Sequence, residues 1–242
     1  MALNLHSLKR LSSKKPPVCT AVIAAAGLSQ RFKGEDKLFY RVGGKPVLAY
    51  TIEAFQNCKL IDDIIVVARE DKYESIGEIC SEYGFNKVSK VIKGGLSRTE
   101  SVINGVFAAS GKARLIAIHD GARPCIDIEI IKNTIYAAAK YHAAAPAVQI
   151  ISTVKRVENN SIVDTVSREG LFEIQTPQVF RAEIIKAALT KAAKKALTLT
   201  DDCMAAEMIG VPVHIVEGSR SNIKITEDED LSIAECLLCR RD

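Results

Sequence analysis

The sequence predicts an α/β fold with a mostly parallel sheet, helices on both faces of the sheet and a protruding β-arm. Short apolar runs of strand length alternate with amphipathic segments of helix length through the first 142 residues, which is the pattern of a parallel sheet. Two further strand-like runs flank the turn signal Asn159-Asn160 within residues 152–175. Two strands alone have little core, so this segment predicts an arm that packs on another surface.

Composition indicates a globular protein that binds neither nucleic acid nor membrane. The chain has 242 residues, 48% of them hydrophobic, which is enough to bury a sizeable core. No apolar run reaches the length that spans a bilayer. The net charge is only +4, aromatic residues make up 5% and tryptophan is lacking, a balance that argues against nucleic-acid binding. No linker or repeat divides the chain, so residues 19–242 are expected to form a single domain.

Cysteine usage favours a reducing, cytoplasmic location. The seven cysteines are odd in number and scattered, unlike a disulfide framework. Cys236 and Cys239 form a lone Cys-x-x-Cys, which we interpret as two small apolar residues one helical turn apart, because no second ligand pair is spaced for zinc. Residues 1–18 are basic and lack the apolar core of a secretory signal, so they predict a disordered extension. A plastid is the alternative location if this extension is the remnant of a transit sequence.

The domain opens on a strand and a loop that suits phosphate. Thr20 to Ala26 is a short apolar run that predicts a buried strand, and Gly27 ends it. The following loop carries Arg31 and Lys37, and both cations and free backbone N–H groups bind phosphate oxygens. The loop is neither a Walker loop nor the dinucleotide fingerprint, because Gly-Lys-Ser/Thr and Gly-x-Gly-x-x-Gly are absent from it. The alternative is an ordinary strand-to-helix connection with two solvated cations.

The next elements continue the alternation. A helix is expected from Val47 after the turn at 43–46, and another after the capping box of Ser97 and Glu100. Strands are predicted over 61–68, 88–92 and 115–118, and helices over 71–83 and, capped by Asp127, to about 142. Polar or glycine-rich sequence marks three strand ends: 27–37, 94–101 and 119–124. Ligands bind beyond the C-terminal ends of parallel strands, so these segments are expected to meet at one site.

Further helices and strands follow the arm, which carries Lys155, Arg156 and Arg168. Helices are predicted over 181–196 and after Thr200-Asp201-Asp202. Late strands are predicted over 211–216 and 222–225. Thr226 and Glu229 predict a capping box for a closing helix.

Several stretches together resemble a known enzyme family. They are Ala25-Ala26-Gly27 with Arg31 and Lys37; Gly94-Gly95 with Arg98 and Ser101; His119-Asp120-Gly121-Ala122-Arg123-Pro124; and Asn222-Ile223-Lys224-Ile225-Thr226. With Thr176-Pro177-Gln178 and Thr200-Asp201-Asp202, they resemble the 2-C-methyl-D-erythritol 4-phosphate cytidylyltransferases over roughly residues 19 to 240. The resemblance implies a Rossmann-like sheet. It also implies transfer of the cytidylyl group of CTP to a polyol phosphate, with release of pyrophosphate and a requirement for Mg²⁺, in non-mevalonate isoprenoid synthesis.

The resemblance implies roles for individual residues. Arg31, Lys37 and Lys224 match the family's catalytic, phosphate-stabilising cations. The nucleotide-binding positions are matched by Ala25, Ala26, Gly27, Gly95, Ser101 and Asp120, and Asp120 also matches the metal ligand. Positions near the second substrate are matched by Arg123, Thr153, Arg168 and Thr176. His119 is expected only to support its strand end. The expected assembly is a homodimer in which each arm lies across the partner.

A few positions depart from the family pattern. Ala24 and Asp36 stand where proline is frequent, and Leu96 stands where an acidic residue is common. These departures bear on the shape of the nucleotide pocket more than on the reaction. The alternatives are a ribitol 5-phosphate cytidylyltransferase, a nucleotidyltransferase that uses GTP or a sugar phosphate, and a non-catalytic nucleotide-binding protein. The combination of Asp120 with the three matched cations favours an enzyme.

Overall fold

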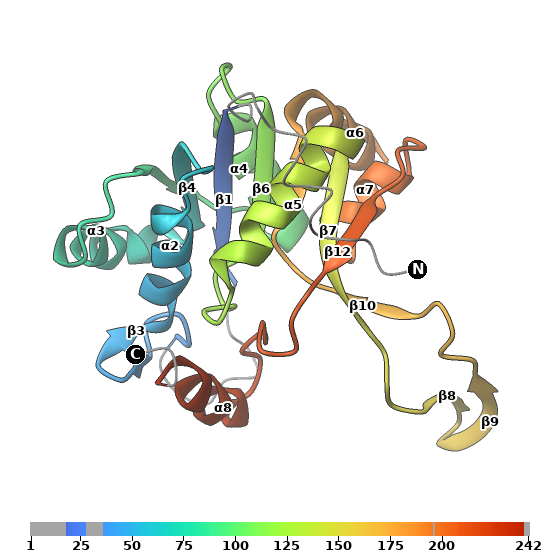
Figure 1. The fold of residues 1–242 in the computed structure, drawn as a ribbon. Helices are drawn as coiled ribbons and strands as arrows, with labels where there is room; N and C mark the ends of the chain where they lie inside the picture. Colours follow the sequence, from blue (N-terminus) through green and yellow to red (C-terminus); the bar gives the residue numbers. More distant parts are fainter. Residues whose placement is uncertain (1–17, 28–35, 196, 240–242) are drawn as a thin grey trace.

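The computed structural model describes residues 18–27, 36–195 and 197–239, and one eight-stranded sheet forms its centre (Figure 1). Parallel strands build one half of the sheet in the order β6-β1-β4-β5. Their bounds are β1 (Cys19–Ala25), β4 (Asp63–Ala68), β5 (Val88–Lys93) and β6 (Leu115–Asp120). All residues of β6 are buried, as in a strand whose two faces are both covered. The predicted α/β class with a mostly parallel sheet is confirmed.

The other half of the sheet is mixed. β11 (Gln178–Arg181) runs antiparallel to β6 and to β7 (Ala143–Gln149), so β7 runs in the same direction as β6. β10 (Phe172–Ile174) pairs antiparallel with the end of β7, and β12 (His214–Glu217) pairs parallel with it. The sequence carries no signal for β7, because it is an alanine-rich segment that contains Pro146, and both residue types are depleted in strands. Its hydrogen-bonded neighbours impose the strand.

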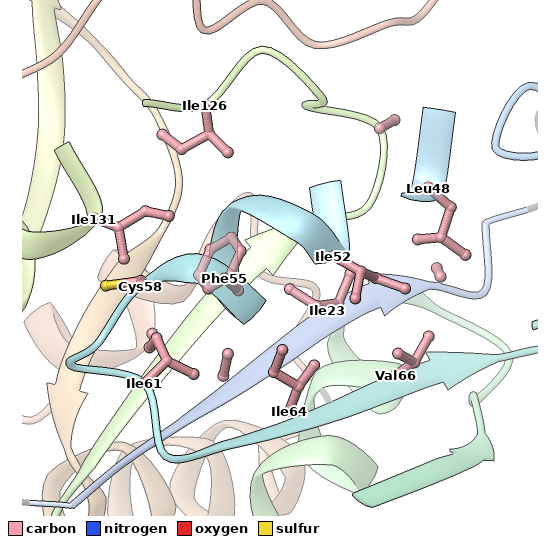
Figure 2. Packing of buried hydrophobic residues seen from close by; sticks show 14 of the residues in the cluster. Ile23, Leu48, Ile52, Phe55, Cys58, Ile61, Ile64, Val66, Ile126 and Ile131 are labelled. Carbon is pink, nitrogen blue, oxygen red and sulfur yellow. The ribbon is translucent and has the colours of Figure 1, made fainter. Parts of the chain in front are cut away.

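Helices cover both faces of the sheet. One buried cluster includes residues of α2 (Val47–Asn57), α3 (Tyr73–Glu82), α5 (Ile128–Tyr141) and α8 (Asp228–Leu238). The other includes α4 (Arg98–Ala108), α6 (Ala182–Lys194) and α7 (Asp202–Glu207). Successive residues of β1 divide between the two clusters. Ile23 lies with Leu48 and Phe55 in the first (Figure 2), and Val22 lies with Val106 in the second.

The described residues also form short elements, which are β2 (Arg41–Val42), β3 (Lys45–Pro46) and the 3-10 turn Glu70–Lys72.

The arm is a two-stranded ribbon that projects from the body of the protein (Figure 1). β8 (Val154–Glu158) and β9 (Ser161–Val166) are joined by Asn159 and Asn160, whose φ angles of 47° and 62° suit a tight hairpin turn that asparagine tolerates. The arm leaves the sheet at the end of β7, the edge at which β1 and β6 also end. The predicted hairpin is confirmed, although its last part, β10, belongs to the main sheet.

The C-terminal region corrects two predictions. Residues 222–225 form no strand, because the side-chain bonds described below hold them in place of a strand ladder. The closing capping box pairs Glu227 with Asp230 and not Thr226 with Glu229. At α4 the predicted box is half confirmed: Ser97 caps Glu100 N, but the Glu100 carboxylate accepts from Leu96 N.

Other expectations concern the chain as a whole. The extension at 1–18 lies almost wholly outside the described residues and stays a prediction. The seven cysteines carry free thiols, and Cys236 and Cys239 are exposed. Among the described residues, no helix has the length and apolar character needed to cross a bilayer.

Gly105 lets α4 lie directly on β1 and β4, and it gives a test of this packing. A Cβ at Gly105 would overlap Val22 Cγ1 and stand 2.8 Å from Val67 Cγ2. We expect Gly105→Ala to lower the free energy of unfolding by about 1–3 kcal/mol, because β-branched neighbours have few rotamers to retreat into. Gly77→Ala in α3 is the matched control, since open space surrounds Gly77 and alanine should stabilise that helix by up to about 1 kcal/mol. Urea unfolding measures both changes. A Gly105→Ala protein as stable as the wild type would contradict this packing.

Candidate active site

A pocket of about 560 Å³ opens where the parallel strands end. β1, β4, β5 and β6 run in one direction, so the segments that follow them meet at one edge of the sheet. The pocket is lined by Ala24, Ala26, Gly27, Lys37, Leu38, Arg69, Gly95, Leu96, Ser97, Arg98, Ser101, Asp120, Ala122, Lys224 and Thr226. The predicted meeting of the three strand-end segments is confirmed for their described residues.

Asp120 is the charged centre of the pocket. It is the last residue of β6 and is only 7% exposed. Three cations surround its carboxylate: Lys224 Nζ at 2.9 Å, Arg98 Nε at 3.4 Å and Arg123 Nε at 3.5 Å. Burial alone would raise the pKa of the Asp120 carboxyl, but the charges of Lys224 and Arg98 outweigh burial and hold that pKa well below its usual range. Asp120 is therefore an ionised carboxylate.

Arg98 joins Asp120 to a second buried carboxylate. Its Nη1 and Nη2 donate to the two oxygens of Asp202 at 3.1 and 2.8 Å, in the bidentate geometry that guanidinium groups favour. The Asp202 side chain is 1% exposed, and its backbone N donates to Gln178 Oε1 at 2.9 Å. Asp201 caps α7 by accepting from Met204 N. The Thr200-Asp201-Asp202 motif therefore anchors Arg98, to which no role is assigned from the sequence.

Lys224 reaches the pocket from a segment that side-chain hydrogen bonds hold, and Lys37 contacts this segment from the 36–39 turn. Asn222 Nδ2 donates to Thr176 O at 3.0 Å, and Arg123 Nη1 donates to Asn222 O at 2.7 Å. These bonds replace the ladder of the predicted strand at 222–225. Lys37 Nζ donates to Ile225 O at 2.7 Å, so Lys37 contacts the segment that carries Lys224.

The Gly94–Ser101 segment brings backbone close to the end of β1. A Cβ on Gly94 would overlap Ala26 Cβ, and a Cβ on Gly95 would overlap Glu100 Cβ. Gly95 N donates to Ser101 Oγ at 3.0 Å, and that hydroxyl donates to Ser97 O at 2.9 Å. Gly95 and Ser101, which are predicted to contact the base, are therefore joined by a hydrogen bond. Only glycine leaves room for it.

His119 lies beneath the pocket and is fully buried. Its Nδ1 lies 2.9 Å from Thr176 Oγ1, and its Nε2 lies 3.3 Å from Arg123 O. Asp120 N donates to the same Thr176 hydroxyl at 3.2 Å. Burial lowers the pKa of His119 to about 3, so the imidazole is neutral and supports the end of β6, as predicted.

Not every predicted site residue lines the pocket. Arg31 lies outside the described residues. Ala25, Arg123 and Thr176 are buried behind the wall, where the last two hold Asp120 in place. Thr153 and Arg168 are exposed on the arm, just outside β8 and β9, and Arg168 donates to Ile151 O.

The pocket also contains Arg69, which follows β4 and which sequence reasoning missed because it lies in no motif. Leu96, the departure expected to affect the nucleotide pocket, stands fully exposed on its rim. No group of three or more His, Cys, Asp or Glu residues within 18–27, 36–195 and 197–239 is placed to hold a metal ion. The Asp120 carboxylate is surrounded by cations and not by further carboxylates that could share a metal ion with it.

Known proteins resemble this chain over nearly its whole length. The family model described as IspD, 2-C-methyl-D-erythritol 4-phosphate cytidylyltransferase, matches residues 19–240. A protein of that name from Clostridium acetobutylicum is 44% identical over 221 residues, which are 90% of this chain and 96% of the relative. One from Halalkalibacterium halodurans is 40% identical over 92% of this chain and 98% of the relative. The crystal structure of 4-diphosphocytidyl-2C-methyl-D-erythritol synthase from Anaerococcus prevotii superimposes with a TM-score of 0.81 at 32% identity, covering 93% of this chain and 97% of that one.

The buried His119 makes stability depend on pH. Its pKa falls from 6.5 to about 3 on folding, so the unfolded chain takes up the proton first as the pH decreases. Stability should therefore fall with pH below about 6.5, with a slope from this group of up to about 1.4 kcal/mol per pH unit. His119→Gln removes this titration. Urea unfolding at about pH 7 and about pH 5 should show a smaller loss of stability in the variant than in the wild type. Equal losses in the two proteins would contradict a neutral, buried imidazole.

Proposed function

The chain belongs to the 2-C-methyl-D-erythritol 4-phosphate cytidylyltransferase family, and we propose that its strand-end pocket transfers the cytidylyl group of CTP to 2-C-methyl-D-erythritol 4-phosphate. The products are 4-diphosphocytidyl-2-C-methyl-D-erythritol and pyrophosphate, within the non-mevalonate route to isoprenoids. The observation that carries the proposal is the position of Lys37, Lys224 and Asp120 together at the pocket edge of the sheet in a chain of this family.

The reaction needs positioned charge more than a reactive side chain. An oxygen of the polyol phosphate attacks the α-phosphorus of CTP and forms a new P–O bond. The bond from the α-phosphorus to the bridging oxygen breaks, and pyrophosphate takes its electron pair. Negative charge builds on the α-phosphate and the leaving group, so catalysis rests on fixed cations and N–H donors. Because His119 is buried and neutral, no proton transfer is assigned to it.

Lys37 and Lys224 are proposed to bind the phosphates of CTP. Both line the pocket, and Lys224 lies 2.9 Å from Asp120, so its ammonium can serve the carboxylate and a phosphate oxygen together. The role of Arg31 as a third cation rests on the family resemblance alone.

Gly95 and Ser101 are proposed to contact the cytosine, with Ala26 and Gly27 lining the same wall. Arg123 and Thr176 act from behind Asp120, and their direct contact with substrate stays a prediction.

We propose that a divalent cation binds beside Asp120. This carboxylate is ionised and lines the pocket, and Mg²⁺ is commonly held by one or two carboxylates together with substrate phosphates. Asp120 would hold the ion. When bound, the ion would neutralise charge on the phosphates. Lys224, Arg98 and Arg123 already balance the carboxylate, so the ion is expected to arrive with the nucleotide.

The second substrate site is proposed to be completed by a partner subunit. The arm leaves the sheet at the pocket edge, and Val157, Ile162 and Val163 are exposed along it. Exposed apolar residues on a ribbon favour contact with another chain, and identical chains exchange such ribbons in closed dimers. Thr153 and Arg168 would then contact the polyol phosphate in the partner's pocket.

The cytoplasmic location stays a prediction, and the matched bacterial relatives give no support to the plastid alternative.

A pyrophosphate-release assay with CTP and Mg²⁺ tests the function. We expect release with 2-C-methyl-D-erythritol 4-phosphate and little with ribitol 5-phosphate. Lys37→Ala and Lys224→Ala should each lower kcat/KM by at least about 100-fold, because each removes a charge aimed at the transition state. Lys132→Ala, which removes a surface lysine on α5, is the control. A higher rate with ribitol 5-phosphate would favour the ribitol enzyme, and CTP binding without release would favour a non-catalytic protein.

A subunit-mixing experiment tests the arm exchange. Arg168→Ala and Lys224→Ala homodimers should each be nearly inactive. After dissociation and random reassociation, about half of the dimers are hybrids, and each hybrid has one intact site if the arm acts across the interface. The mixture should then recover about a quarter of wild-type activity. Verified hybrids that stay inactive would mean that the arm serves its own subunit.

A further inference from the structure

Arg69 connects the pocket ends of two strands. It directly follows β4, and its Nη1 donates to the carbonyl of Gly27, just beyond β1, at 3.1 Å. Its Nη2 lies 2.9 Å from Asp36 Oδ2. Its Nε forms a third, outward contact with Asp71 at 3.2 Å, where the aspartate side chain is 62% exposed. One guanidinium therefore ties the end of β4 to residues that flank the proposed phosphate-binding loop.

Asp36 in turn organises the residues around Lys37. Its Oδ1 accepts from Leu38 N at 3.2 Å, and its carbonyl accepts from Phe39 N at 2.8 Å. Lys37 lies inside this turn, so Asp36 sets the direction of its backbone. The Asp36 side chain is only 6% exposed, and a buried carboxylate is costly unless a cation balances it. Arg69 supplies such a cation.

We propose that Arg69 is a positioning residue for Lys37. Through Asp36 it holds the 36–39 turn, so that the Lys37 ammonium bonds Ile225 O at 2.7 Å and faces the pocket near Lys224. The inference rests on the proposed function, in which Lys37 binds the phosphates of CTP.

The departure of Asp36 from the family pattern has a physical meaning in this arrangement. Proline restricts its own φ by its ring, whereas an aspartate needs an external partner to be fixed. Here the ion pair with Arg69 provides that restriction. Arginine suits the task better than lysine, because its planar fork can contact a carbonyl and a carboxylate at once.

Four single variants and one double variant test the inference. Arg69→Gln removes the cation, Arg69→Lys keeps the charge without the fork, and Asp36→Asn removes the carboxylate. Asp71→Asn is the matched control, because it alters the outward contact of the same guanidinium, and a 3.9 Å contact with Lys72, while it leaves the contacts of Arg69 with Gly27 and Asp36 in place. Steady-state kinetics with CTP, thermal unfolding and the reactivity of Lys37 toward reductive methylation, followed by mass spectrometry, are measured for each. Lys45, which is paired with Glu53 at 2.6 Å, is the internal reference for the labelling.

The expected result is specific to Lys37. Arg69→Gln and Asp36→Asn should raise its methylation relative to Lys45 and lower kcat/KM by about 10- to 100-fold, because a misplaced group costs that much when geometry supplies the catalysis. Arg69→Lys should fall between Arg69→Gln and the wild type. The double variant Arg69→Gln/Asp36→Asn should be no worse than either single variant, because the two residues act as one unit. Asp71→Asn should behave as the wild type.

Other outcomes overturn the inference. Unchanged Lys37 methylation with normal kinetics removes any role for Arg69, and lost activity with unchanged methylation indicates direct contact between Arg69 and phosphate. A parallel rise at Lys45 indicates general loosening of the fold. If Arg69→Gln fails to fold, Arg69→Lys and Asp36→Asn decide the question. If the wild type releases no pyrophosphate, the proposed function fails, and Lys37 methylation still decides whether Arg69 positions this lysine.

Discussion

The site depends on keeping one buried carboxylate, Asp120, ionised at the end of a central strand. An ion in this position is tolerated only when opposite charges surround it, and Arg98, Arg123 and Lys224 do so. Arg98 is itself balanced by the buried Asp202. Cations outnumber carboxylates in this network, so it retains positive charge where a nucleotide would place its phosphates. The need to balance Asp120 thus also supplies the charge that the proposed reaction uses.

The same network explains why the C-terminal part of the chain follows an irregular path. Lys224 must reach Asp120, yet a regular strand at 222–225 would direct its backbone groups into a ladder. Side chains take over instead: Asn222 is fully buried and bonded to Gln175 and Thr176, and Arg123 bonds its carbonyl. Thr176 also bonds His119 and Asp120. These hydrogen bonds fix the pocket wall as one unit, although Asn222 Oδ1 accepts no hydrogen bond from the described residues.

Sequence reasoning located the strand ends because apolar runs followed by glycine or polar residues are local signals, and Gly94-Gly95 and His119-Asp120 are such signals. It missed β7, whose alanines favour a helix by propensity and become a strand only through β11 and β12. It placed a strand at 222–225, a segment in which Ile223 and Ile225 alternate with polar residues. The pairing of Arg98 with Asp202 joins residues 104 positions apart, and no local pattern encodes such a contact. The contact of Arg69 with Asp36 likewise depends on tertiary structure.

Arg98 shows how a local rule is broken where function requires it. It is the first residue of α4, where the helix dipole disfavours a cation and where Ser97 already provides a cap. Its unfavourable position is offset by bidentate pairing with Asp202 and contact with Asp120. Gly105, further along the same helix, lets α4 pack directly on β1 and β4. This packing sets the position of the first turn, which carries Arg98. The packing of α4 and the Ser97 cap therefore direct the Arg98 guanidinium toward Asp120, although the helix N-terminus disfavours its charge. Conflict between propensity and position is expected at such sites, because the tertiary contacts that resolve it are the ones that chemistry needs.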